Sequence, residues 1–127
     1  MSLEYINTDK APKATGHYSQ AVKAGRTVYI SGQIPLDPVT GIRVTGGITT
    51  QTQRVLDNIK AIAEAAGGSM DKIVKTTVYL RSIENAKYVN AVYESNFTGN
   101  MPARSTIGVL DLPRASDVEI EAVMYLD

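Results

Sequence analysis

The feature that most constrains this chain is its C-terminal segment 118–126, VEIEAVMYL. Every even-numbered residue in it is apolar, and this period of two is typical of a β-strand with one buried face. Glu119 and Glu121 fall on the opposite face. We therefore predict a sheet that packs one face on a core and carries two carboxylates on the other.

A second strand is expected shortly before this segment. Pro102 lacks an amide donor and biases its predecessor toward extended backbone, so a helix cannot run through this point. The strand then begins near Thr106, and Arg104 lies just before its start. If the two strands form a hairpin, Thr106 lies opposite Glu119 and Arg104 opposite Glu121, all on the non-core face.

Arg104 has two readings. Its guanidinium fork can bind a carboxylate ligand through two parallel hydrogen bonds. Alternatively, it pairs with a structural Asp or Glu at the strand end. For Glu121, a structural role as the partner of Arg104 or of a lysine is favoured over a catalytic role.

The remaining elements follow from periodicity and turn residues. Apolar side chains at helical spacing predict helices over about 49–66 and 85–97, and Gly67-Gly68 supplies a left-handed cap for the first. Strand-forming residues predict strands within 4–7, 16–22, 27–31 and 73–81. Gly32 marks a bulge or a close approach to the backbone. The order β-β-α-β-α-β-β predicts an α+β fold with both helices on one sheet face.

The uncovered sheet face has a consequence for assembly. It would expose Val123, Tyr125 and either Tyr29 or Tyr79, a patch too apolar for a monomer. We expect an oligomer that buries this face, because hiding each large side chain contributes roughly a kcal/mol or more. Site residues on the face would then lie in a cleft between subunits.

Composition excludes several function classes. The 127 residues fit one domain, 1–127, and 13 basic residues balance 13 acidic ones, so no basic field favours nucleic acid. Without cysteine and with a single histidine, the chain offers no disulfide, no thiol nucleophile and no multi-histidine metal centre. No segment has transmembrane length or the layout of a signal peptide, so we expect a cytoplasmic protein.

Six motifs taken together resemble the Rid family of reactive-intermediate deaminases. They span nearly the whole chain, in order: GHYSQA at 16–21, ISGQIP at 30–35, VKTTV at 74–78, VNAVY at 89–93, PARS at 102–105 and VEIEA at 118–122. The resemblance implies a chorismate-mutase-like α+β fold and a homotrimer whose sheets form a central barrel, with clefts between subunits. The implied reaction is hydrolysis of 2-imino acids or their enamine tautomers, such as 2-iminobutanoate or 2-iminopropanoate, to 2-oxo acids and ammonia, with no cofactor and no metal.

The resemblance also implies roles for individual residues. Arg104 matches the arginine that grips the substrate carboxylate, and Glu119 matches the acid that positions and activates water, assisted by the backbone at Thr106. The residues that match the pocket lining are Tyr18, Ser31, Gly32 and Asn90. Two positions depart from the family pattern: His17 stands where proline is usual, and Thr106 stands where many members have cysteine.

Structural roles remain open for several of these residues. Tyr18 could equally be a core or interface aromatic, and Asn90 a solvent-facing helix residue. For Ser31, a strand hydroxyl hydrogen-bonded to the backbone is favoured over a catalytic role. For His17, a loop or surface position is favoured. As whole-protein alternatives, the chain could be a carboxylate-binding or chaperone-like trimer without turnover, or a ribonuclease that inhibits translation; zero net charge argues against the ribonuclease.

Overall fold

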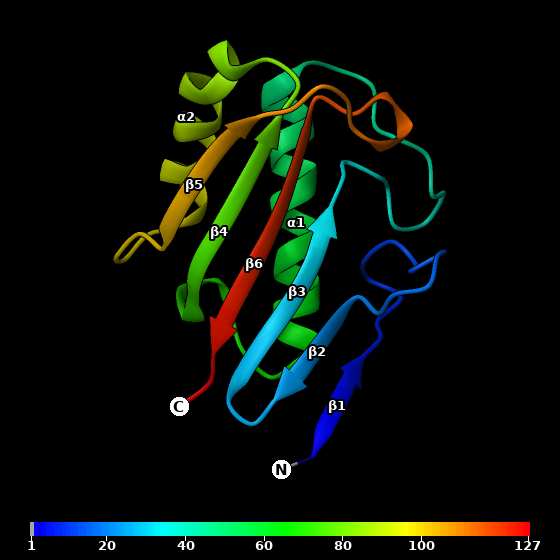
Figure 1. Ribbon diagram of the computed structural model, residues 1–127, viewed down its shortest axis with the longest axis vertical. Helices are drawn as coiled ribbons and strands as arrows, with labels where there is room; N and C mark the ends of the chain where they lie inside the picture. The colour runs from blue at the N-terminus through cyan, green and yellow to red at the C-terminus, as the bar shows by residue number, and fades with distance from the viewer. Residues whose placement is uncertain (1) are drawn as a thin grey trace.

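The computed structural model describes residues 2–127, and its centre is one six-stranded mixed sheet (Figure 1). The strands lie in the spatial order β1-β2-β3-β6-β4-β5. Their bounds are β1 Leu3–Ile6, β2 Ala21–Ala24, β3 Thr27–Gln33, β4 Ile73–Leu80, β5 Ala103–Gly108 and β6 Val118–Tyr125. All neighbouring pairs are antiparallel except β4 and β5, which run parallel.

Two helices, α1 (Ile48–Ala65) and α2 (Ala86–Asn96), pack on the same face of this sheet (Figure 1). The even-numbered side chains of β6 are buried against them, as the alternation predicts. The fully buried core side chains include Val28, Val78, Leu80, Ile120 and Met124 from the sheet and Val55, Leu56, Ile59 and Ile62 from α1. The predicted α+β arrangement with two helices on one face is confirmed.

The end of α1 follows from two glycines. Gly67 has φ +93°, a conformation that costs a residue with a Cβ about 1–2 kcal/mol. Its amide donates to the Glu64 carbonyl, and the Gly68 amide donates to the Ala63 carbonyl. This pair of bonds is the Schellman cap, which satisfies carbonyls at the helix end, so the predicted left-handed cap is confirmed.

The predicted terminal hairpin is wrong. β4 lies between β5 and β6, so Arg104 pairs with Thr76 of β4, and Glu121 pairs with Thr77 on the other side of that strand. Residues 109–117 are too long a connection for a tight hairpin and cross over the end of β4 instead. α2 meanwhile provides the crossover that parallel β4 and β5 require.

Three strands, β1, β2 and β3, precede α1, as the ranges 4–7, 16–22 and 27–31 predict, whereas the predicted order β-β-α-β-α-β-β counted only two of them. The strand expected within 16–22 begins only at Ala21. Residues 16–20 are irregular and carry Tyr18 out of the sheet. No helix within residues 2–127 is both long and apolar enough to span a membrane.

Candidate active site

Glu119 lies against the backbone of Gly32 on the face of the sheet that the helices leave open. The β3–β6 register shifts between Ile30 and Gln33, so Gly32 sits in an irregularity of β3. A Cβ added at Gly32 would lie 2.1 Å from Glu119 Oε2. Of the two alternatives predicted for Gly32, a bulge or a close approach, the close approach is confirmed, and the group that approaches is the candidate catalytic carboxylate.

The environment of Glu119 favours its neutral form. Burial raises the pKa of the half-buried Glu119 carboxyl above its ordinary value, and the negative charge of Glu121 raises it further. A carboxylate with a raised pKa is a better proton acceptor than an ordinary one near neutral pH.

A cavity of about 940 Å³ opens in front of this carboxylate. Among the predicted site residues it is lined by Tyr18, Ser31, Gly32 and Glu119, together with Glu121. Loop side chains also line it, notably Leu36, Pro38 and Val39, together with two cationic residues, Lys13 and Arg114. The cavity lining therefore combines apolar side chains with two carboxylates and two cations.

Ser31 and Tyr18 have different roles in this cavity. The Ser31 hydroxyl donates to the Ser19 carbonyl at 2.6 Å, so it is satisfied by backbone, as was favoured. Tyr18 is 54% exposed, which excludes the core alternative within this chain. The segment from Thr8 to Pro12 is held by the side chain of buried Gln20. Its Oε1 accepts from the Thr8 amide, and its Nε2 donates to the Thr8 and Pro12 carbonyls.

Arg104 occupies a different part of the molecule, at the β5 edge of the sheet. Its Nη2 donates to Asn90 Oδ1 at 2.6 Å, and its guanidinium carbon lies 4.9 Å from the centre of the Tyr93 ring. Within residues 2–127, neither Arg104 nor Glu121 forms an ion pair. The structural-pair readings of Arg104 and Glu121 are therefore wrong for the described chain, and Asn90 contacts Arg104 rather than solvent alone.

The predicted common face for the four polar side chains is also wrong. Arg104 and Thr106 are in register with Thr76 and Val78, which are buried on the helix side. Glu119 is in register with Tyr79, and like Glu121 it projects on the open side. A single chain thus carries two groups of predicted site residues on opposite faces, which we call the candidate half-sites: Arg104 with Asn90 and Thr106, and Glu119 with Tyr18, Ser31 and Gly32.

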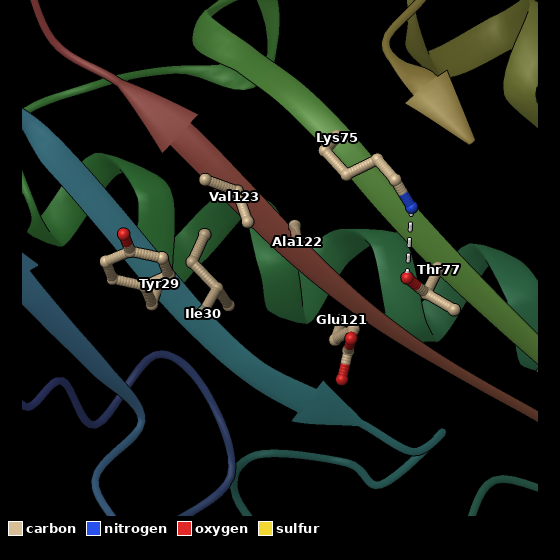
Figure 2. Close-up of a pocket in the computed structure, with 7 residues that line it drawn as sticks. All are labelled: Tyr29, Ile30, Lys75, Thr77, Glu121, Ala122 and Val123. Carbon is tan, nitrogen blue, oxygen red and sulfur yellow. Dashed lines mark hydrogen bonds between the residues drawn. The ribbon is translucent and has the colours of Figure 1, made fainter. Parts of the chain in front are cut away.

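The open face itself holds a smaller hollow of about 200 Å³ (Figure 2). Figure 2 shows Tyr29 of β3, Glu121 of β6 and Lys75 of β4 around it, with Lys75 Nζ donating to Thr77 Oγ1 at 3.3 Å. Tyr29 is 55% exposed and Tyr125 is 47% exposed. The structure thus confirms that this face leaves aromatic side chains in solvent.

Sequence reasoning did not assign site roles to Tyr79, Tyr93, Lys13 or Arg114. Burial raises the pKa of the Tyr79 phenol, and the charge of Glu121 adds to this, so the phenol stays protonated beside both glutamates. Tyr93 follows Asn90 by three positions, a spacing that places two helical side chains on one face. No such signal identifies Lys13 or Arg114, because loop folding alone brings them to the cavity.

The chemistry available to the site is that of carboxylates, a guanidinium, amides and hydroxyls. Within residues 2–127 no cluster of three or more His, Cys, Asp or Glu side chains has a geometry that could hold a metal ion. His17 lies in the exposed irregular loop next to Tyr18, which agrees with the loop position favoured for it.

Comparison with known proteins gives one consistent result. The family model described as Endoribonuclease L-PSP matches residues 8–126. A RutC family protein of Pyrococcus horikoshii is 49% identical, over 96% of this chain and 97% of its own. The human protein named 2-iminobutanoate/2-iminopropanoate deaminase is 48% identical, over 93% of this chain and 86% of its own. The crystal structure of E. coli TdcF with bound serine superposes with a TM-score of 0.92 at 36% identity, covering 98% of this chain and 99% of that one. The chain therefore belongs to the Endoribonuclease L-PSP family, which is the YjgF/Rid family that its motifs resemble.

Proposed function

We propose that the protein is a hydrolytic deaminase that converts small 2-imino acids, or their enamine tautomers, to 2-oxo acids and ammonia. The observation that carries this proposal is Arg104, a guanidinium held at an open edge by Asn90 and Tyr93 without a carboxylate counter-ion in residues 2–127. Such a fork suits the carboxylate of a 2-imino acid. The name of the human relative supports the substrate class, and the serine in the E. coli structure is a small molecule with the same carboxylate.

The proposed active site is assembled from two copies of the chain. Arg104 and Glu119 lie on opposite faces of one sheet, so a substrate can contact both only where the β5 edge of one copy meets the open face of another. That interface joins two different patches, and repeated head-to-tail contacts of this kind close into a ring when the rotation between successive copies permits closure. We propose a homotrimer whose open faces, with Tyr29 and Tyr125, line a central barrel.

In the proposed reaction each residue has a limited task. Arg104 binds the carboxylate, with Asn90 fixing one guanidinium nitrogen, and Tyr18, Ser31, Gly32 and Thr106 line the pocket. Glu119 orients a water molecule and accepts its proton as the C–O bond forms at the iminium carbon, while the C=N π electrons move to nitrogen. Glu119 then returns its proton to the nitrogen. The C–N bond breaks with its electron pair leaving on ammonia, while the hydroxyl oxygen loses its proton to Glu119 and forms the C=O bond of the 2-oxo acid. An iminium carbon is already electrophilic, so orientation and proton transfer suffice to accelerate the reaction.

The first test is direct turnover. A pyridoxal-phosphate threonine dehydratase generates 2-iminobutanoate, and release of 2-oxobutanoate is followed with and without the protein. We expect acceleration by the unmodified protein and none by Arg104→Ala or Glu119→Ala, with all three proteins showing the same oligomeric mass. Full activity in Arg104→Ala would end the assignment.

Mixed assemblies test the two-copy site. Arg104→Ala and Glu119→Ala subunits are unfolded, mixed in equal amounts and refolded together. If each site takes Arg104 from one subunit and Glu119 from another, about a quarter of the interfaces combine two intact half-sites, so about a quarter of the activity returns. A site within one chain predicts no recovery at all.

The same preparations separate the alternatives. A binding protein without turnover would bind 2-oxobutanoate but leave the rate of 2-iminobutanoate hydrolysis unchanged. A ribonuclease would cleave RNA, and cleavage that persists in both variants after rigorous purification would place that activity at another site.

A further inference from the structure

We propose that Tyr93 is a positioning residue for Arg104: its ring is the fixed surface on which the guanidinium lies while it binds the substrate carboxylate. This inference rests on the proposed function, in which Arg104 is the carboxylate anchor. The guanidinium carbon is 4.9 Å from the ring centre, within the range of a cation–π contact. Arg104 itself is exposed, whereas Tyr93 is only 4% exposed, so the ring forms a buried floor beneath a solvent-facing cation.

The ring is held from two further directions. The Tyr93 hydroxyl donates to Thr76 Oγ1 at 2.9 Å, and Thr76 is buried in β4, directly in register with Arg104 of β5. On the helix, Phe97 packs against Tyr93 with ring centres 4.9 Å apart. The plane of the ring is therefore set by both β4 and α2, and it does not depend on Arg104.

Asn90 completes the arrangement one turn earlier on α2. It accepts from Arg104 Nη2 at 2.6 Å, while Tyr93 lies under the guanidinium. A guanidinium carries five N–H donors in a rigid plane. With its central carbon over Tyr93 and one nitrogen on Asn90, the planar guanidinium is restrained at two points, and its remaining donors stay available for two parallel bonds to a carboxylate.

A purely structural role for Tyr93 predicts a different outcome. As a core side chain alone it would affect folding, and any loss of activity would follow the folded fraction, with KM unchanged. As a positioning residue, Tyr93 affects how tightly Arg104 binds the substrate carboxylate. Losing the ring should then raise KM by roughly 2- to 5-fold, the range expected for a cation–π contact at an exposed site, with kcat within about twofold of the unmodified protein.

The geometry can be read by NMR in the unmodified protein. The Arg104 Nε–H resonance is identified by its disappearance in Arg104→Lys. We expect it to be shifted upfield by the Tyr93 ring current in the unmodified protein and in Tyr93→Phe, and to move to the position of a free arginine in Tyr93→Leu. An unshifted resonance in the unmodified protein would overturn the proposal even if Tyr93→Leu fails to fold.

Kinetics with enzymatically generated 2-iminobutanoate complete the test. Tyr93→Phe keeps the ring and should retain KM within about twofold, whereas Tyr93→Leu should show the increase. Tyr88→Leu is the matched control, because Tyr88 lies on the same helix and its ring faces Lys87 instead, so its KM should not change. Equal losses in Tyr93→Phe and Tyr93→Leu, or a fall in kcat at constant KM, would refute the positioning role. Full activity in Arg104→Ala would instead refute the proposed function, and the ring-current shift would still report the contact.

Discussion

Gly32→Ala tests most sharply whether the position of Glu119 matters. The new Cβ would lie 2.1 Å from Glu119 Oε2 and 3.0 Å from its Cδ. An ordinary contact begins at about 3.4 Å, so the carboxylate oxygen has to retreat by about 1.3 Å. The end of a flexible side chain can move this far, so we expect a loss of less than about 1 kcal/mol in the free energy of unfolding, in the range of ordinary surface substitutions or a little above.

Activity should respond far more strongly than stability. A misplacement of about 1 Å in a catalytic group can cost on the order of 10²-fold in rate, so kcat for 2-iminobutanoate hydrolysis should fall by roughly that factor. Urea unfolding and the coupled 2-oxobutanoate assay measure the two quantities on the same preparation. Glu119→Ala supplies the baseline, and Gly32→Ala in that background should have no further effect. Near-normal kcat in Gly32→Ala would refute the idea that Glu119 works from the observed position.

Three further substitutions follow from the structure. The raised pKa of the Glu119 carboxyl means that its ionisation opposes folding, so the free energy of unfolding falls as pH rises through that pKa. The double variant with Arg104→Ala and Glu119→Gln should therefore have a higher urea midpoint at pH 7 than the single variant Arg104→Ala. Below about pH 4, where the carboxyl is protonated in both the folded and the unfolded chain, this difference should disappear. Gln20→Ala should lower the free energy of unfolding by about 2–3 kcal/mol, because partly buried backbone groups of Thr8 and Pro12 lose their partners, and an unchanged urea midpoint would contradict this. Ala115 has φ +54°, so Ala115→Gly should stabilise by about 0.5–1 kcal/mol, the cost of the left-handed region less the entropy that glycine adds, and a lower melting temperature would count against that strain.

Much of the fold could be predicted from local patterns. Period-two alternation identified β6, helical spacing identified α1 to within a residue or two of its ends, and paired glycines identified its cap. These signals succeed because each reflects which side chains one element must bury or which backbone angles a turn requires. The prediction for Gly32 belongs to the same class, since glycine in a strand marks a place where another group needs the room.

Strand pairing could not be predicted from the same patterns. Consecutive strands usually lie side by side, and that tendency favoured a β5–β6 hairpin. Two signals opposed it: a connection over 109–117 longer than a hairpin loop, and a helix between β4 and β5 that suits a parallel crossover. Because β4 lies between β5 and β6, the face of Arg104 is set by its register with β4, and this register places it on the opposite face from the one predicted. Residues such as Arg114 reach the cavity through loop folding, for which the chain carries no periodic signal.

Placing Arg104 and Glu119 on opposite faces has a chemical consequence that the predicted hairpin would have lacked. Had Arg104 stood directly opposite Glu121, the pair would have formed an ion pair, lowered the carboxyl pKa values and occupied the guanidinium. In the observed register the guanidinium donates to Asn90 and lies over the Tyr93 ring, and it forms no ion pair within residues 2–127. The Glu119 carboxyl, beside Glu121 and Gly32, keeps a raised pKa. Each candidate half-site thus retains in the single chain the state that the proposed reaction needs, and in the proposed assembly the two meet where a second copy brings the β5 edge to the open face.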